Sequence, residues 1–370
     1  MAEKVLMKGN EAIAEAAVRA GCRFFFGYPI TPQSEVAAYM SRRMPKVGGT
    51  YLQAESEVAA INMVYGCSAA GRRVMTSSSS PGVSLKGEGI SYMIGADLPA
   101  LIVNIQRGGP GLGGIQPSQA DYWMATRASG HGDGHIIVFA PSTVQEMADL
   151  VALAFELGDK YRTPVMVLAD GLLGQMMEPV ELPEPLNIED LPEKPWAIDG
   201  HKSQRDANNV NSLFMDPQML EDSIQARFER YRQIRAHEQR SESFMMDDAE
   251  IAMVAYGAAS RIARSAVVKA RKQGIKVGLI RPITLFPFPV DAIEAAADKV
   301  KAFLVTEFSM GQMVDDVRLA VNGRKPVNYF AHTGGVVQTP DEVVEALKLV
   351  DAGESVNLVP MHGKLTGDLK

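Results

Sequence analysis

The sequence has few cysteines, no basic run and no long apolar run. Cys22 and Cys67 are its only cysteines, too few for a disulfide framework or a four-cysteine iron–sulfur or zinc site, so any such cluster must lie on a partner. The formal net charge of -7 argues against binding a nucleic-acid backbone. No segment approaches the ~18 apolar residues of a membrane span. Glu3, Lys8 and Glu11 stand where a signal peptide is apolar. We therefore expect a cytoplasmic protein that binds neither nucleic acid nor a membrane.

The chain length of 370 residues predicts two compact domains with connections. Apolar runs alternate with amphipathic stretches in the first half, which is typical of a parallel sheet covered by helices. Prolines then cluster, a charged helical stretch follows, and the alternation resumes. We expect an α/β domain over 1–185, a linker or helical arm over 186–248, a smaller α/β domain over 249–350 and a C-terminal tail over 351–370.

Hydrophobic periodicity sets the expected elements. In the first domain the expected strands are Arg23–Gly27, Arg73–Thr76, Ala100–Ile105, Ile136–Ala140 and Pro164–Leu168, and the expected helices are Glu11–Ala20, Ser34–Arg43, Ser56–Ala70 and Thr143–Lys160. In the second domain the expected strands are Ile251–Tyr256, Lys276–Ile280 and Ala302–Glu307, and the expected helices are Ser260–Gln273, Val290–Asp298 and Asp341–Leu349.

The segment Gly27–Pro32 follows one of these strands and precedes a helix. Ligands of a doubly wound sheet collect at the carboxyl ends of strands, where loops present backbone amides and hydroxyls. Two prolines stiffen this loop, so Thr31 would be presented with little conformational freedom. The competing interpretation is a rigid turn with Pro32 at the first helical position.

Glu57 enters an expected helix rich in small residues, and Glu55 lies two residues before it. A carboxylate beside Val58 and Ala59 would be partly desolvated, which makes it a candidate for holding and passing on a proton. In the alternative interpretation both glutamates are first-turn acids that the helix dipole stabilises.

Arg107 ends an apolar strand and opens a glycine loop, an arrangement suited to gripping a substrate carboxylate with two hydrogen bonds. A surface arginine at a strand end is an equally good local interpretation. Residues 109–114 also read GxGxxG, but prolines interrupt the region and no helix is expected to open on these glycines. A nicotinamide site is therefore improbable.

Two further segments are ambiguous. The hydroxyl-rich stretch Thr76–Gly82 predicts either a cofactor-binding loop or a turn with local side-chain bonds. His131 and His135 stand in a glycine loop without a third ligand at a metal-site spacing, so a plain loop is favoured.

Taken together, the motifs resemble the alpha subunit of the 2-oxoacid:ferredoxin oxidoreductases over nearly the whole chain. Within that family the likeness is closest to the branched-chain (2-oxoisovalerate) type, particularly in MKGNEAIAEAA and LLGQMMEPVELPEP. The segments that carry the resemblance are GNEAIAEAAVRAG, FFFGYPITPQSE, QAESEVAAINMVYGCSAAG, TSSSSPGVSLK, NIQRGGPGLGGIQPSQAD, YRTPVMVLAD, RPITLFPFP and TEFSMGQM.

The resemblance implies a first domain like the pyrimidine-binding domain of thiamine-diphosphate enzymes and a second like the transketolase C-terminal domain. It also implies that thiamine diphosphate is shared with a beta subunit that carries the diphosphate site, Mg²⁺ and a [4Fe-4S] cluster. Coenzyme A would be the co-substrate and ferredoxin the acceptor, with gamma or delta subunits as further partners.

Residue by residue, the resemblance assigns Glu57 to the cofactor's aminopyrimidine ring. Glu57 is preferred to Glu55 because Gly66 lies nine residues beyond it, as thiamine-enzyme patterns place it. Thr31 and Arg107 match the residues that hold the 2-oxoacid carboxylate.

The neighbouring Tyr28, Pro29 and Ile30 belong to the same cofactor-binding loop motif, and nothing is assigned to Gln33. The implied activity is oxidative decarboxylation of a branched-chain 2-oxoacid to acyl-coenzyme A, carbon dioxide and reduced ferredoxin. Alternatives are the same chemistry on 2-oxoglutarate, pyruvate or an aryl 2-oxoacid, and a subunit that has lost its chemistry.

Overall fold

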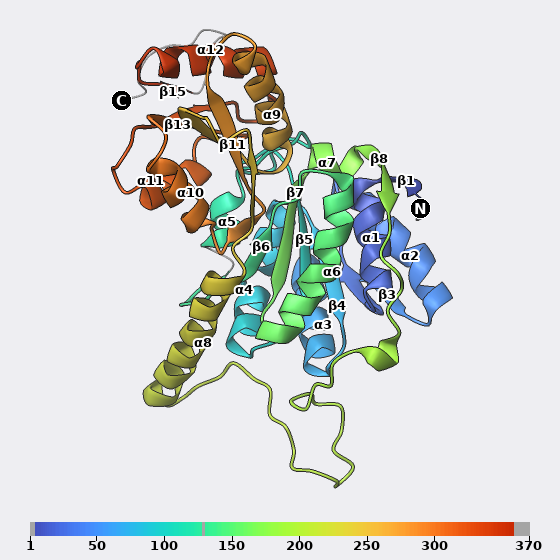
Figure 1. Cartoon of the computed structure of the whole chain (residues 1–370). Helices are drawn as coiled ribbons and strands as arrows, with labels where there is room; N and C mark the ends of the chain where they lie inside the picture. Colours follow the sequence, from blue (N-terminus) through green and yellow to red (C-terminus); the bar gives the residue numbers. More distant parts are fainter. Residues whose placement is uncertain (1–3, 128–129, 359–370) are drawn as a thin grey trace.

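The computed structural model describes residues 4–127 and 130–358, which form two sheets with helices on both faces (Figure 1). The first sheet has the strand order β12-β6-β7-β5-β4-β2-β3 and is parallel except for β12, which pairs antiparallel with β6. Its strands are β2 (Phe24–Gly27), β3 (Thr50–Gln53), β4 (Val74–Ser78), β5 (Leu101–Gln106), β6 (Ile137–Phe139), β7 (Val165–Asp170) and β12 (Thr284–Phe286).

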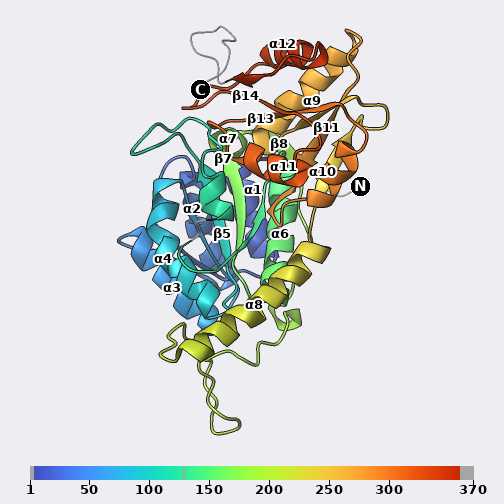
Figure 2. The same cartoon turned by 90° about the vertical axis from the view of Figure 1, so that its left-hand side faces the viewer.

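Helices cover both faces of this sheet because its central strands are apolar along their whole length, as in sheets buried on two sides. On one face α1 (Gly9–Arg19) packs against α2 (Ser34–Arg43) and α6 (Val144–Tyr161), and on the other α3 (Glu57–Ala69) packs against α4 (Pro81–Gly95). Figure 2 shows α3 and α4 side by side.

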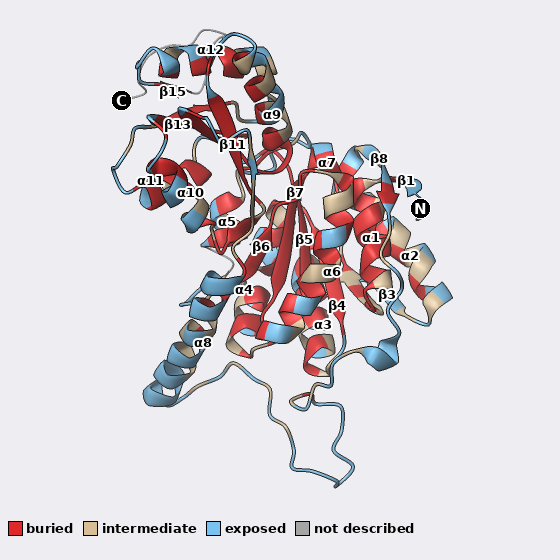
Figure 3. Ribbon diagram, viewed as in Figure 1, coloured by how far each residue is buried: buried red, intermediate tan, exposed pale blue. Residues whose placement is uncertain are grey.

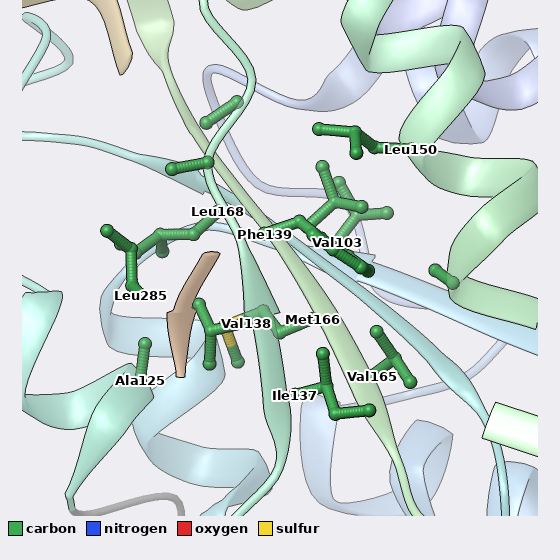
Figure 4. Packing of buried hydrophobic residues seen from close by; sticks show 14 of the residues in the cluster. Val103, Ala125, Ile137, Val138, Phe139, Leu150, Val165, Met166, Leu168 and Leu285 are labelled. Atoms are coloured by element: carbon green, nitrogen blue, oxygen red, sulfur yellow. The ribbon is translucent and has the colours of Figure 1, made fainter. Parts of the chain in front are cut away.

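The core of the first domain also takes in a side chain from far along the sequence. Leu285 of β12 packs with Val138, Phe139 and Met166 of β6 and β7 (Figure 4). A strand from the second half of the chain therefore completes the first sheet, which ties the two domains together.

The second sheet has the order β15-β14-β13-β10-β11-β9, parallel except for the edge strand β9. Its strands are β9 (Ser241–Phe244), β10 (Ile251–Val254), β11 (Val277–Pro282), β13 (Ala302–Glu307), β14 (Val327–Ala331) and β15 (Asn357–Leu358). On one face α9 (Gly257–Arg271) packs against α12 (Pro340–Asp351), and α10 (Val290–Ala297) packs against α11 (Met313–Val321) on the other (Figure 1).

The segment between the two sheets is an exposed connection followed by a long helix. The strand pair β1 (Lys4–Lys8) and β8 (Met177–Glu181) precedes an exposed stretch that contains η2 (Ile188–Asp190) and leads to α8 (Pro217–His237) (Figure 3). One side of α8 is anchored, since Tyr231 is buried.

Strand β9, although it falls within the expected arm, pairs with the second sheet. Of the expected tail, residues 359–370 lie outside the described residues. The short helices α5 (Tyr122–Thr126) and α7 (Gly171–Gln175) complete the described elements.

Each strand and helix expected from the sequence is present, with ends shifted by at most a few residues. The turn interpretation of Thr76–Gly82 was wrong at both ends of the segment. Strand β4 continues through Ser78, and α4 begins at Pro81. The elements not expected were helices α4, α5, α7 and α11 and strands β1, β3, β8, β9, β12, β14 and β15. Helix α4 escaped notice because it is rich in glycine and serine and its apolar residues do not form a clear stripe.

The buried amide of Gln119 joins the two domains. Its Nε2 donates to the Tyr256 carbonyl at 2.9 Å, and its Oε1 accepts from the Phe308 backbone N–H at 3.0 Å. Along the parts of the chain that the structure describes, no helix is long and apolar enough to cross a membrane.

Candidate active site

The predicted site residues converge where the strand order of the first sheet reverses. The chain passes from β2 outward to the edge strand β3 and then returns to β4 on the other side of β2. Such a switch point leaves a crevice beyond the carboxyl ends of the strands, where α/β proteins bind ligands. The loops after β2, β3, β4 and β5 all end at this edge.

Glu57 lies at this edge, as the first residue of α3, and only 6% of its surface is exposed. The hydroxyl of Ser56 caps the helix by accepting from Ala59 N at 3.2 Å, which fixes where the first turn begins. Glu55 is exposed and accepts a bond from the Ser56 hydroxyl. No donor to the Glu57 carboxylate is found among the described residues. The burial thus separates the two glutamates, and only Glu57 faces the interior.

Gly82 explains how the Glu57 carboxylate fits against α4. A Cβ atom at position 82 would lie 2.6 Å from Glu57 Oε1 and 2.2 Å from Ser78 Oγ, both closer than real contacts. The glycine therefore lets the start of α4 approach the carboxylate directly.

Thr31 is exposed in the loop after β2, and hydrogen bonds from neighbouring elements support this loop. Asn10 Nδ2 and Gln175 Nε2 both donate to the Pro32 carbonyl, at 2.8 and 3.3 Å. Gln33 is fully buried, and its Oε1 accepts from the Ser77 hydroxyl at 2.6 Å. Helix α2 begins at Ser34, so the alternative with Pro32 at the first helical position is wrong.

Sequence reasoning missed Asn10, Gln33 and Gln175 as supports of this loop. A polar residue beside the loop prolines was the only signal for Gln33. The other two lie far along the sequence and could not have been found.

Arg107 joins the loop after β2 to the glycine loop after β5. Its Nη1 donates to the Thr31 carbonyl at 3.0 Å and its Nη2 to the Leu112 carbonyl at 3.3 Å, while Nε is buried without a partner. The structure therefore brings Thr31 and Arg107 together. The guanidinium retains N–H groups beyond those two bonds, since arginine carries five.

A buried network fixes the backbone at Arg107. The Ser80 hydroxyl accepts from Arg107 N at 3.0 Å and donates to Asp121 Oδ2 at 2.6 Å, and Asn104 Nδ2 also donates to Asp121 at 2.9 Å. Burial raises the pKa of Asp121, and the bonds from Ser80 and Asn104 oppose that rise. The ends of β4 and β5 are thus locked together.

Four buried polar groups in and just after β4 and on α4 have no hydrogen-bond partner among the described residues: the hydroxyls of Thr76, Ser78 and Ser79 and the ammonium of Lys86. Ser78 Oγ lies next to the site, since it and Glu57 Oε1 are both within 2.6 Å of the position that a Cβ of Gly82 would take. Unpaired buried polar groups are costly, so they call for a functional explanation.

The remaining motifs lie apart from this site or lack the features of a site. The glycines at 109–114 form an exposed loop with a bridge between Gly108 and Gly114, and no helix opens on them. His131 is exposed, whereas His135 stacks on Phe286 at 4.3 Å between ring centres. Within residues 4–127 and 130–358, no three His, Cys, Asp or Glu side chains are grouped as a metal site would need.

Two family models together match most of the chain. Residues 15–246 match the pyruvate flavodoxin/ferredoxin oxidoreductase thiamine-diphosphate-binding model, and residues 249–343 match core domain II of pyruvate:ferredoxin oxidoreductase. The chain belongs to the 2-oxoacid:ferredoxin oxidoreductases. The expected family and fold class are thereby confirmed.

Curated relatives of this 2-oxoacid:ferredoxin oxidoreductase chain match it almost from end to end. Ketoisovalerate oxidoreductase subunit VorB of Methanothermobacter thermautotrophicus is 51% identical over 95% of this chain and 98% of that protein. The 2-oxoglutarate synthase subunit KorA of Methanocaldococcus jannaschii is 38% identical over 92% of this chain and 98% of its own length.

A solved 2-oxoglutarate:ferredoxin oxidoreductase from Magnetococcus marinus, with 2-oxoglutarate, coenzyme A and succinyl-CoA bound, superposes with a TM-score of 0.84 at 28% identity. The match covers 95% of this chain and 66% of that one.

The residues at the switch point fit the ring end of thiamine diphosphate. An aminopyrimidine ring needs a buried hydrogen-bonding acid, which Glu57 provides, and a close backbone approach, which Gly82 allows. The unpaired Nε of Arg107 fits a carboxylate nearby.

Proposed function

We propose that this chain is the alpha subunit of a branched-chain 2-oxoacid:ferredoxin oxidoreductase and supplies Glu57, Thr31 and Arg107 to an active site shared with a beta subunit. The observation that carries the proposal is the buried Glu57 carboxylate, which has no hydrogen-bond donor among the described residues and lies at the same switch point as the Thr31–Arg107 pair. The 51% identity to a ketoisovalerate oxidoreductase subunit supports the choice of substrate class.

When bound, thiamine diphosphate would supply a carbon nucleophile that attacks the keto carbon and accepts the charge left by departing carbon dioxide. Glu57 Oε would hold a proton for the ring nitrogen and take it back, which is general acid–base catalysis. Arg107 would bind the substrate carboxylate through N–H groups that its two backbone bonds leave free, with the Thr31 hydroxyl beside it. These two residues position the substrate. Tyr28, Pro29 and Ile30 would shape the wall of the ring pocket.

Partners complete this proposal. The beta subunit would carry the diphosphate site, Mg²⁺ and a [4Fe-4S] cluster, since the whole sequence has only two cysteines. The elements at this edge carry exposed apolar side chains, Leu52 on β3, Val58 on α3 and Leu85 on α4, which would suit a protein partner. Gamma or delta subunits, ferredoxin as acceptor, coenzyme A as acyl acceptor and the cytoplasmic location remain predictions.

The test uses the chain coexpressed with its partner subunits. Glu57→Gln should lower the rate of 2-oxoisovalerate oxidation by ~10²-fold or more, the usual contribution of a positioned acid or base. Glu55→Gln, two residues away and exposed, should stay within about twofold of wild type, the small effect expected of a surface change. A Glu57→Gln enzyme that folds, assembles and keeps its rate would refute the role.

Substrate competition tests the second candidate. The similarity to a 2-oxoglutarate synthase subunit makes 2-oxoglutarate the alternative substrate, and its distal carboxylate would require an additional cation in the pocket. Specificity constants measured with 2-oxoisovalerate and 2-oxoglutarate in the same mixture should favour the branched-chain acid. A preference for 2-oxoglutarate would replace the substrate but leave the catalytic roles in place.

A further inference from the structure

Lys86 is a buried ionisable residue to which the proposed function gives no role. Its side chain is fully buried, and its ammonium has no hydrogen-bond partner among the residues that the structure describes. A buried lysine without a partner is costly, because burial penalises its charge and its donors go unpaired. Nothing in the fold of α4 requires this cost, since the neighbouring buried positions Val83 and Ile90 are apolar. The cost points to a function.

The packing of α3 on α4 places Lys86 against Glu57. A Cβ at Gly82 would contact Glu57, and a Cβ at Gly89 would contact Ile61 at 2.4 Å. Lys86 lies one turn beyond Gly82 and one turn before Gly89, on the same side of α4. Its side chain therefore enters the space between Glu57 and Ile61.

We propose that Lys86 is a positioning residue for proton transfer, whose buried positive charge stabilises the Glu57 carboxylate when the proton has passed to the cofactor ring. The inference rests on the proposed function. In this step one proton leaves Glu57 Oε for the ring nitrogen and later returns, while Lys86 keeps its own protons and forms no covalent bond. An adjacent cation favours the charged form of a carboxylate, so it favours the state in which the ring holds the proton.

The surroundings of Lys86 make this pairing specific. Glu57 on α3 is the charged group that acts on Lys86, and strand β4 carries no titratable side chain. Glu88 on its own helix is exposed and bonds to Tyr92, and the exposed His131 lies on the outer side of α4, near Tyr92.

Burial lowers the pKa of Lys86 to about 8, and the charge of Glu57 acts in the opposite direction. Lys86 is therefore mostly charged at pH 7, and its charge is lost as the pH rises through about 8. The proposed assistance should fade over the same range.

The test measures hydrogen–deuterium exchange at C2 of thiamine diphosphate bound to the assembled complex, which reports proton transfer separately from turnover. Lys86→Met should slow the exchange at pH 7 by roughly 10- to 100-fold, the effect of one charge over several ångströms at an effective dielectric constant of about 20. Glu88→Gln on the same helix is the matched control and should leave the exchange within about twofold of wild type, as expected of an exposed change. The wild-type rate should also fall above about pH 8, in step with the Lys86 pKa.

Parallel variants separate the possible failures. If Glu57→Gln slows exchange and a folded, cofactor-loaded Lys86→Met does not, the role of Lys86 is refuted and the proposed function stands. If Glu57→Gln also leaves exchange unchanged, the proposed function fails first. Should Lys86→Met not assemble, the wild-type pH profile decides, because exchange that stays constant between pH 7 and 9 overturns the inference.

Discussion

Replacing Gly82 by alanine tests whether the contact between α4 and Glu57 positions the carboxylate that we propose to be catalytic. The new Cβ would lie 2.6 Å from Glu57 Oε1, about 0.8 Å short of the 3.4 Å at which ordinary contact begins, and 2.2 Å from Ser78 Oγ. The Ser78 hydroxyl must rotate to relieve the shorter contact, and the Glu57 carboxylate must shift to relieve its own. A misplacement of about 1 Å costs ~10²-fold in rate.

The same change should affect stability far less than activity. Alanine improves helix propensity by up to ~1 kcal/mol over glycine, and overpacking a tight site costs ~1–3 kcal/mol. The net loss of unfolding free energy is thus ~2 kcal/mol or less. We therefore expect a folded subunit that assembles normally but turns over 2-oxoacid ~100-fold more slowly.

Gly87→Ala is the matched control for this experiment. Gly87 lies on the same helix, and among the described residues a Cβ there would come no nearer than 3.8 Å, to the Gly130 backbone. Steady-state rates and melting temperatures of both variants in the assembled complex complete the comparison. The reasoning fails if Gly82→Ala keeps more than half of the wild-type rate, or if Gly87→Ala loses as much as Gly82→Ala does.

Three further predictions concern binding, pH and domain coupling. Lysine in Arg107→Lys cannot form two paired hydrogen bonds to a carboxylate. KM for the 2-oxoacid should therefore rise by ~10-fold or more, the equivalent of losing one charged hydrogen bond. An unchanged KM would show that Arg107 does not bind the substrate. Burial raises the pKa of Asp170 to about 6, against ~3.9 in the unfolded chain. The folded chain therefore binds the extra proton between these values, and wild-type stability falls as pH rises through that window. The asparagine side chain does not titrate, so the unfolding free energy of Asp170→Asn should rise relative to that of wild type by up to ~3 kcal/mol between about pH 4 and 6, with no further rise above about pH 6. Urea unfolding at several pH values measures this, and a difference between variant and wild type that does not change with pH would contradict it. Gln119→Leu leaves the Phe308 N–H unpaired, whereas the Tyr256 carbonyl keeps its bond from the Ser260 N–H at 3.2 Å. The change should lower the unfolding free energy by ~1–3 kcal/mol; a melting temperature within 1 °C of wild type would show that the amide is dispensable.

The local sequence pattern was sufficient to predict the strands and helices that position the site. The strand before Tyr28, the helix after Gln33 and the strand before Arg107 were all expected near their observed ends. Each of them has a strong apolar run or a clear amphipathic period, so its short-range signal agrees with its final packing. The convergence of Thr31, Glu57 and Arg107 at one edge follows from the rule that parallel strands present their carboxyl ends together.

Local pattern failed where packing between distant segments decides the environment of a residue. Glu55 and Glu57 are indistinguishable as first-turn acids in the sequence, and their separation depends on how α3 lies against α4. Lys86 reads as a solvent-facing charge in a helix that has no clear apolar stripe. Its burial exists only because two glycines allow α3 and α4 to approach closely.

The sequence by itself determined the α/β alternation, the three site loops and the shortage of cysteines. These features depend on residue type and short-range spacing. Only the tertiary structure decided which carboxylate is buried, that Arg107 binds the Thr31 carbonyl, and that the buried Lys86 has no hydrogen-bond partner among the described residues. The physical reason is that burial and charge pairing depend on contacts between segments far apart in the chain, which no local pattern encodes.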